Sequence, residues 1–232
     1  MAFVPDPGVC VQKWEAQLIV ADGSVHDPYS VPPPPAAMAG MSVRAAPGVV
    51  PQGYVGRDQA ETACRNTTRR GFRYRLCTKD EWQAACRGPA RRLFPYGTDY
   101  RIEGYCNTHK FPDEQHLVLR FYPDAGWTTS QMNDRRINQE PDGLARTGAY
   151  RRCTSAYGVF DLVGNLQEWV STLSPARDGR QLGMAMGDHY MGQGKNYQGC
   201  DARDVYHPYY PDQFGKNQRD YSRGIRCCAD PE

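Results

Sequence analysis

The chain has 232 residues, of which 40% are hydrophobic and 11% aromatic, a composition typical of a globular protein rather than a disordered one. Its formal net charge is only +2, so nothing in the charge balance favours nucleic acid or an anionic membrane as a partner. No apolar run approaches the roughly 20 residues of a membrane span, so the chain is not expected to cross a bilayer.

Nine cysteines in a chain of this size indicate an oxidising compartment outside the cytoplasm, periplasmic or extracellular. The first residues lack the basic and apolar regions of a signal peptide, so we expect an export signal that is absent from this chain. The alternative is a cytosolic protein with buried free thiols. Because the count is odd, at least one thiol stays unpaired or bonds to another chain.

The N-terminal part contains a strand pattern and a linker pattern. Residues 9–15 alternate as a strand does, and this strand is expected to pair with the main body. The proline-rich residues 31–37 are expected to be extended. We therefore expect one domain over residues 1–232, in which residues 1–40 pack on a core of residues 41–232.

Two short helices are predicted from capping-box patterns. Asp58 with Glu61, and Thr78 with Glu81, have the spacing at which cap and N3 side chains satisfy the first amides of a helix. The residues expected to face inward are Ala60, Ala63 and Cys64 in the first helix, and Trp82, Ala85 and Cys86 in the second. Beyond residue 88, turn signals and a lack of periodicity predict loops and short strands.

Several short motifs follow one another in order. They are Arg75-Leu76-x-Thr78-x-x-Glu81-Trp82, Ala85-x-Arg87-Gly88, Phe94-Pro95-Tyr96-Gly97, Cys106-Asn107, Tyr157-Gly158-x-x-Asp161-x-Val163-Gly164-Asn165-x-x-Glu168-Trp169 and Gly224-Ile225-Arg226-Cys227. In this order they resemble the formylglycine-generating enzyme (sulfatase-modifying factor) family, in a cysteine-rich bacterial branch. The resemblance implies an α+β, loop-rich variant of the C-type lectin fold, with short helices, small antiparallel sheets and low secondary-structure content.

The resemblance also implies two disulfides, Cys64 with Cys227 and Cys86 with Cys200. Each would close a loop of more than a hundred residues, which in the chain-entropy model stabilises the fold by about 4–5 kcal/mol. The further pairs expected are Cys106 with Cys153 and Cys77 with Cys228. Cys10 is then left over. A bond between the neighbouring Cys227 and Cys228 is the alternative, but such a ring is strained.

In this family the loop of residues 161–168 holds a structural calcium ion. The matching ligands are the side chains of Asp161 and Glu168 and the carbonyls of Gly164 and Leu166. Calcium takes six to eight hard oxygens and mixes carboxylates with carbonyls, as this set would. The alternative is a plain turn whose carboxylates are solvated or bonded to backbone amides.

The resemblance implies a second calcium site. It would use the side chain of Asn107 and the carbonyl of Thr108. Its remaining ligands fall in a loop that the motifs do not align, with Asp113 and Asp124 as candidates.

The family enzyme oxidises a cysteine to formylglycine with Cu(I) held between two thiolates. Here the two copper positions fall near Tyr190 and Lys195, and residues 184–199 contain no cysteine. Gln167 also stands where the family usually has tryptophan. These departures argue against that activity. Met184, Met186, His189 and Met191 could instead hold Cu(I), or the methionines could simply fill gaps in a core.

Aromatic residues gather near the C-terminus and predict a binding surface that includes His189, Tyr190, Tyr206, Tyr209 and Tyr210. The alternative is that the tyrosines cap a thin core. The function expected is an exported, non-catalytic binding or scaffold module that binds a protein or glycan, or serves as an accessory subunit in a larger assembly. The alternative function is a metal-dependent oxidoreductase that uses copper or iron.

Overall fold

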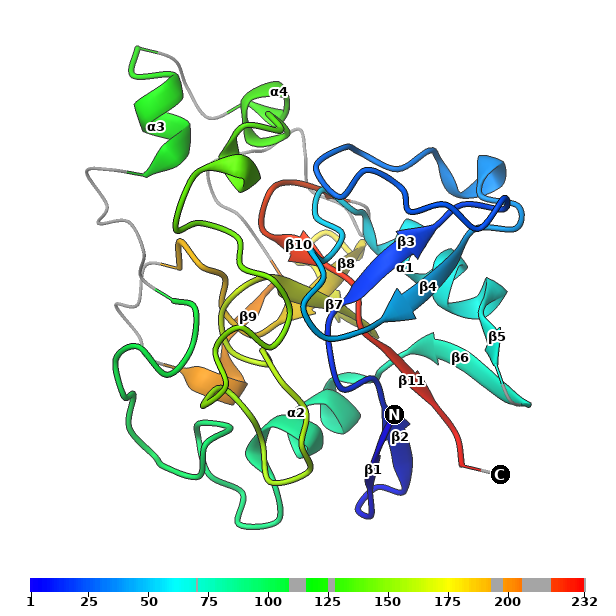
Figure 1. Ribbon diagram of the computed structural model, residues 1–232, viewed down its shortest axis with the longest axis vertical. Coiled ribbons are helices and arrows are strands. Elements are labelled where there is room, and N and C mark those ends of the chain that lie inside the picture. The colour runs from blue at the N-terminus through cyan, green and yellow to red at the C-terminus, as the bar shows by residue number, and fades with distance from the viewer. Residues whose placement is uncertain (70, 109–115, 125–127, 193–197, 206–217, 232) are drawn as a thin grey trace.

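Short elements and long connections make up the fold (Figure 1). The computed structural model describes residues 1–69, 71–108, 116–124, 128–192, 198–205 and 218–231. The helices in these ranges are α1 (Arg57–Asn66), α2 (Lys79–Arg87), α3 (Leu117–Phe121) and α4 (Thr129–Met132), with 3₁₀ turns at η1 (Pro35–Ala37), η3 (Ile137–Gln139) and η4 (Gly199–Asp201). No helix within them is long and apolar enough to cross a bilayer. The expected α+β fold with low secondary-structure content is confirmed.

The two ends of the chain meet in one sheet. Its strands are β1 (Ala2–Val4), β2 (Val9–Val11), β11 (Cys227–Ala229), β6 (Phe72–Leu76) and β5 (Thr68–Arg69), in that order. Cys228 of β11 lies opposite Val11 on one side and Arg75 on the other, and both pairings are antiparallel. The expected pairing of the N-terminal strand with the main body is therefore present, although β2 ends at Val11 because the chain bends at residues 13–14.

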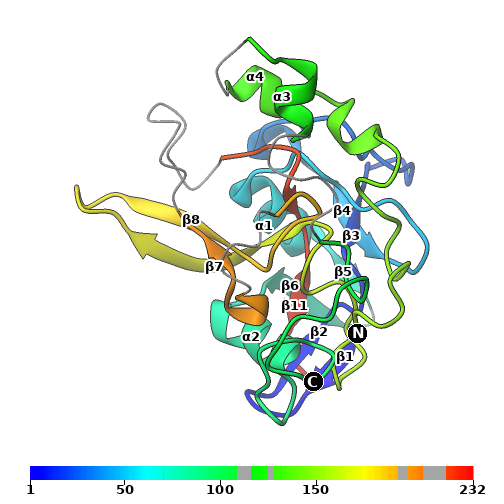
Figure 2. The ribbon, with the colours of Figure 1, turned by 90° about the vertical axis from the view of Figure 1, so that its left-hand side faces the viewer.

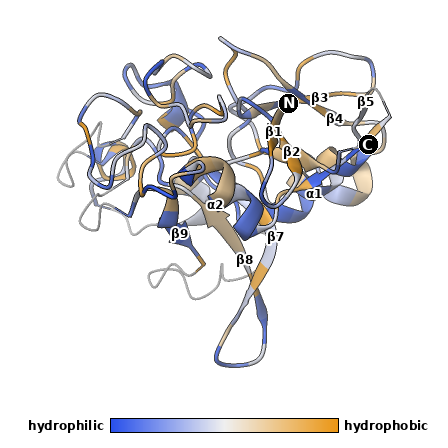
Figure 3. Ribbon diagram, turned by 90° about the horizontal axis from the view of Figure 1, so that it is seen from below, coloured by the Kyte–Doolittle hydropathy of each residue, from blue (hydrophilic) through white to orange (hydrophobic). Residues whose placement is uncertain are grey.

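A second sheet carries a long hairpin. Its strands are β10 (Arg223–Gly224), β7 (Gln167–Pro175), β8 (Gln181–Met186) and β9 (Arg203–Asp204). Strands β7 and β8 extend away from the rest of the protein (Figure 2), and the tip of this hairpin is hydrophilic (Figure 3). Strands β3 (Ala16–Ile19) and β4 (Ser42–Ala45) form a separate antiparallel pair.

The two predicted helices are present, but one begins differently. Thr78 caps α2 as expected: its hydroxyl accepts from the amide of Glu81, and the Glu81 carboxylate accepts from the amide of Thr78. The cap of α1 is Gly56 rather than Asp58, because the side chain of Gln59 reaches back to the Gly56 amide. The residues expected to face inward are buried in both helices.

The proline-rich segment is not extended throughout. The 3₁₀ turn η1 begins at Pro35, after Pro34 in an extended conformation. A proline at the first position of a helical turn loses no hydrogen bond, and its fixed φ suits the turn. The carbonyls of Pro32 and Pro33 accept from the side chain of Gln59, which ties the segment to the start of α1.

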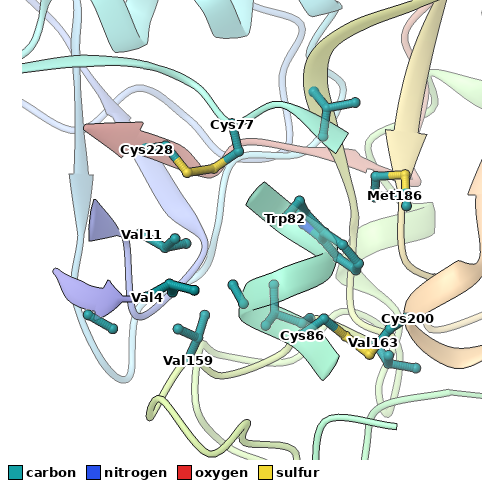
Figure 4. Packing of buried hydrophobic residues seen from close by; sticks show 14 of the residues in the cluster. Val4, Val11, Cys77, Trp82, Cys86, Val159, Val163, Met186, Cys200 and Cys228 are labelled. Carbon is teal, nitrogen blue, oxygen red and sulfur yellow. A yellow bond between two sulfur atoms is a disulfide. The ribbon is translucent and has the colours of Figure 1, made fainter. Parts of the chain in front are cut away.

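Three hydrophobic clusters form the core. The first surrounds Trp82 and includes Val4, Val11 and Met186 together with three disulfides, of which Cys77–Cys228 and Cys86–Cys200 are drawn in Figure 4. The second lies between α1 and the sheets, and the third lies under α3 and α4 around Tyr54 and Tyr190. Because each cluster is small, covalent links between the segments that form it contribute strongly to its stability.

Four disulfides lie within the first two clusters: Cys64 with Cys227 in the second, and Cys77 with Cys228, Cys86 with Cys200 and Cys106 with Cys153 in the first. These are the pairs expected from the sequence, and Cys10 is the one free cysteine. Both helix cysteines are joined to the C-terminal third of the chain, across 163 and 114 residues. The alternative bond between Cys227 and Cys228 is not formed.

Candidate functional site

The loop of residues 161–168 is tightly wound. Asp161, Gly164 and Asn165 all have positive φ angles, of 59°, 86° and 60°. A Cβ atom at Gly164 would lie 2.3 Å from the carbonyl oxygen of Asn107, so only glycine fits there. The same close approach places Asn107 and Thr108 beside the loop. The two predicted calcium ligand sets are therefore neighbours in the fold.

Glu168 lies in a buried ion pair. Its Oε2 accepts from Trp82 Nε1 at 2.6 Å and from Arg226 Nε at 2.7 Å, and its Oε1 accepts from Arg226 Nη2 at 2.6 Å. Glu168 and Arg226 are both fully buried. The guanidinium also donates to the carbonyls of Gln12 and Phe160, so it joins β2, the loop and the last strand.

Glu15 is a third buried carboxylate at this point. Its Oε1 accepts from the amide of Leu166 at 3.0 Å, and its Oε2 accepts from Asn165 Nδ2 at 2.5 Å. Burial raises the pKa of Glu15 well above its usual range, and the nearby charges of Asp161 and Glu168 raise it further. Burial also raises the pKa of Asp161 to about 6, although the amide of Gly148 donates to its Oδ2 at 2.6 Å.

The charges of this centre do not balance. Glu15, Asp161 and Glu168 share the single guanidinium of Arg226, so full ionisation leaves an excess of two negative charges in the interior. A divalent cation would remove the excess. Among the described residues, no three His, Cys, Asp or Glu side chains are placed to hold one metal ion, so a cation here depends on carbonyl and amide oxygens as well.

Glu168 and Asn107 each bring a side-chain oxygen with remaining acceptor capacity to the loop. Glu168 Oε2 already accepts two hydrogen bonds, whereas Oε1 accepts one. The buried Oδ1 of Asn107 has no hydrogen-bond partner within the described residues, while its Nδ2 donates to Gly143 and Asn165. These oxygens and the charge excess fit a hard cation. Asp124 is exposed, and Asp113 lies outside the described residues.

Sequence reasoning missed Glu15 and Arg226 as members of this centre. Arg226 was part of a recognised motif, and a lone arginine in the apolar run Gly-Ile-Arg-Cys-Cys-Ala is a signal for a buried charge. Glu15 gives no comparable signal, because its partner Asn165 lies 150 residues away.

The predicted binding surface is corrected at Tyr190. This side chain is fully buried, and its hydroxyl donates to Asn138 Oδ1 at 2.7 Å, so it cannot contact a partner. His189 is half-buried and lies edge-on to the rings of Tyr190 and Tyr221. Tyr206, Tyr209 and Tyr210 lie outside the described residues, as does Lys195.

The methionines near His189 pack in two different places. Met184 and Met186 are buried on one side of β8 in the Trp82 cluster, which confirms the packing interpretation for both. Met191 is buried with Tyr190 in the third cluster. The three methionines suggested as Cu(I) ligands are therefore divided between two clusters.

A family model described as the sulfatase-modifying factor enzyme 1-like domain matches residues 35–231. The chain belongs to this family. The sulfatase-modifying factor match excludes the first strands, yet β2 pairs with β11 inside the matched region. No curated protein matches the chain.

Similar solved structures include three proteins. They are CarF (16% identity, TM-score 0.41, 94% of this chain and 60% of that chain), PvdO from Pseudomonas aeruginosa (18%, 0.49, 81% and 64%) and Treponema denticola variable protein 1 (15%, 0.39, 94% and 62%). The matched part of this sulfatase-modifying factor-like chain spans about three fifths of the length of these structures.

The disulfides also bear on where the protein folds. Disulfides persist in oxidising environments and are rare where glutathione keeps thiols reduced. Eight of the nine cysteines of this sulfatase-modifying factor-like chain are paired. This degree of pairing indicates an oxidising, extracytoplasmic environment.

Proposed function

We propose that this chain is a non-catalytic binding or scaffold module that is exported to the periplasm or secreted. It presents its surface to a protein or a glycan, either alone or as an accessory subunit of a larger assembly. The disulfides and the buried charge centre act in this proposal as devices that keep a loop-rich surface in a fixed shape.

The pairing of the cysteines carries the proposal. A Cu(I) centre of the family type needs two thiolates. Four disulfides use eight of the nine cysteines, and the remaining Cys10 lies on β2, opposite Phe3 of β1. One thiol cannot supply two ligands. Moreover, Tyr190, at one of the family's copper positions, is buried and hydrogen-bonded to Asn138.

Two measurements on protein purified without chelator test this proposal. Metal analysis is expected to find no stoichiometric copper or iron. Oxygen consumption with a sulfatase-type Cys-x-Pro-x-Arg peptide is expected to equal that of buffer, and the peptide is expected to stay unmodified. Stoichiometric copper or iron together with thiol-dependent oxygen uptake would favour the metal-dependent oxidoreductase instead.

We further propose that calcium balances the buried charge centre. Asp161 and Glu168 would contribute carboxylate oxygens, and Gly164 and Leu166 would contribute carbonyls. The adjacent second site would use Asn107 Oδ1 and the carbonyl of Thr108. The charge excess of the three carboxylates over Arg226 and the unpartnered Oδ1 of Asn107 support this proposal.

Removal of calcium is expected to destabilise the fold. A ligand present at a hundred times its Kd stabilises the native state by about 2.7 kcal/mol, so EDTA should lower the melting temperature by several degrees. Excess calcium should restore it, whereas magnesium should not, because magnesium demands a stricter octahedral geometry. Identical melting curves with EDTA and with calcium would contradict the proposal.

A further inference from the structure

An open hollow of about 430 Å³ lies beside the loop that follows α2. Its described lining residues are Phe94, Asp99, Tyr100, Arg101 and Glu103. The volume is within the range of small-ligand sites, and Tyr100 is 66% exposed at the surface. His189 and Tyr190, the described residues of the predicted binding surface, are not among these lining residues.

A narrower recess continues from this hollow, since both share Phe94 and Arg101. Tyr96 and Asp188 are also among its lining residues. The ring of Tyr96 stacks on Phe94, with centroids 5.4 Å apart. The recess therefore has an aromatic wall together with a carboxylate.

Among the described residues, few groups donate to the carboxylate of Asp188. Within the described residues, its side chain makes one hydrogen bond, from the amide of His189 to Oδ1 at 2.9 Å. The carboxylate packs on Gly192, where a Cβ would lie 1.8 Å from Oδ1. Asp188 is half-buried, and a carboxylate partly removed from water is stabilised by a group that supplies N–H donors.

The described charges around the hollow leave one negative charge over. Asp99 is paired with Arg92, at 2.5 Å. Of the two other carboxylates, Asp188 has the positive charge of Arg101 near it, which leaves the exposed Glu103 as the remaining described negative charge. The remaining charge favours a ligand with a single positive charge and disfavours an anionic one such as a sulfated glycan.

We propose that the hollow and its recess bind one basic side chain, a lysine or an arginine, presented by a partner protein. The ammonium or guanidinium group donates to Asp188, and the aliphatic stem lies against Phe94 and Tyr96, as such stems do on apolar surfaces. Tyr100 contacts the flanking peptide at the rim. The inference rests on the proposed binding function, and it names the class of ligand that the module would bind.

The test is an NMR titration with a lysine peptide, acetyl-Gly-Lys-Gly-amide. The same peptide with an acetylated lysine keeps the stem and removes the charge. The protein variants are Asp188→Asn, which keeps the shape, and Asp178→Asn, a control at the hairpin tip where Asp178 pairs only locally with Arg180. Asp188→Asn is expected to weaken binding about tenfold or more, because a hydrogen bond to a charged group is lost.

Tyr100→Ala provides a variant that is independent of the Asp188 carboxylate. Tyr100 is exposed, so its replacement should leave folding unchanged and still weaken binding several-fold. Equal binding of the acetylated peptide, or full binding by both Asp188→Asn and Tyr100→Ala, would overturn the inference. So would displacement of the peptide by calcium, since the carboxylate would then be a metal ligand.

Failure here is distinguishable from failure of the proposed function. If the protein contains no redox metal and does not bind the lysine peptide, the module proposal stands and the inference of a basic ligand is rejected. Protein that contains stoichiometric copper or iron and consumes oxygen rejects the module proposal, whatever the peptide titration shows.

Discussion

Arg226 is the residue on which the buried charges depend. It donates twice to Glu168 and once each to the carbonyls of Gln12 and Phe160. Through these bonds one side chain connects the N-terminal segment, the 161–168 loop and the last strand. Its full burial means that every lost contact leaves a polar group without water to replace the partner.

Arg226→Met is expected to destabilise the protein by about 3–5 kcal/mol, because it leaves the buried Glu168 without its counter-charge. Chemical denaturation in EDTA, where no calcium ion can serve as the counter-charge of Glu168, measures the loss relative to the unsubstituted protein under the same conditions. Adding Glu168→Gln should recover part of it, since the double variant no longer buries that unpaired charge. A double variant that is less stable than the sum of the single losses would contradict this explanation.

Gly158 and Gly164 have similar backbone angles but different surroundings. Their alanine variants therefore distinguish the cost of a left-handed backbone conformation from the cost of a steric clash. Gly158 has φ +73° and open space around a Cβ, whereas Gly164 has φ +86° and the Asn107 carbonyl 2.3 Å away. Gly158→Ala should cost about 1–2 kcal/mol, the penalty of the left-handed conformation alone. Gly164→Ala should cost clearly more by the same denaturation assay. Equal losses would show that the loop can move away from Asn107.

Among the helices and strands, the features that the sequence predicted correctly are those that depend mainly on short sequence patterns. The Thr78 capping box, the buried faces of both helices and the N-terminal strand pairing follow from short-range patterns or from the need to bury an edge. The cap of α1 was wrong by two residues, because Gln59 caps as well as glutamate does. The Glu15 contact with Asn165, 150 residues away, has no local signal.

The corrected start of α1 can be tested against α2. Thr78→Ala removes an N-cap hydroxyl and should cost about 0.5–2 kcal/mol. Asp58→Ala should cost less, because Asp58 lies in the first turn and pairs with Arg57 rather than capping the helix. Thermal unfolding of both variants measures the difference. A larger loss for Asp58→Ala would restore Asp58 as the cap.

At the scale of the whole molecule, the disulfides determine both the fold and the function proposed. They join the helices to the C-terminal third, and they consume the thiols that a family copper centre would need. The family resemblance, rather than composition or periodicity, predicted two of the pairs. The recess beside the hollow could not be predicted, since its described walls combine residues 94–108 with Val163, Asp188 and Gln198, which are far apart in the sequence.

A thiol count tests whether the disulfides consume the thiols that a family copper centre would need. The protein is denatured without reductant and alkylated, and its mass and peptide map are then determined. We expect one alkylated residue per chain, Cys10, and cross-linked peptides that contain the four observed pairs. Three or more alkylated cysteines per chain would contradict the account, because a pair of thiolates would then be available for a metal.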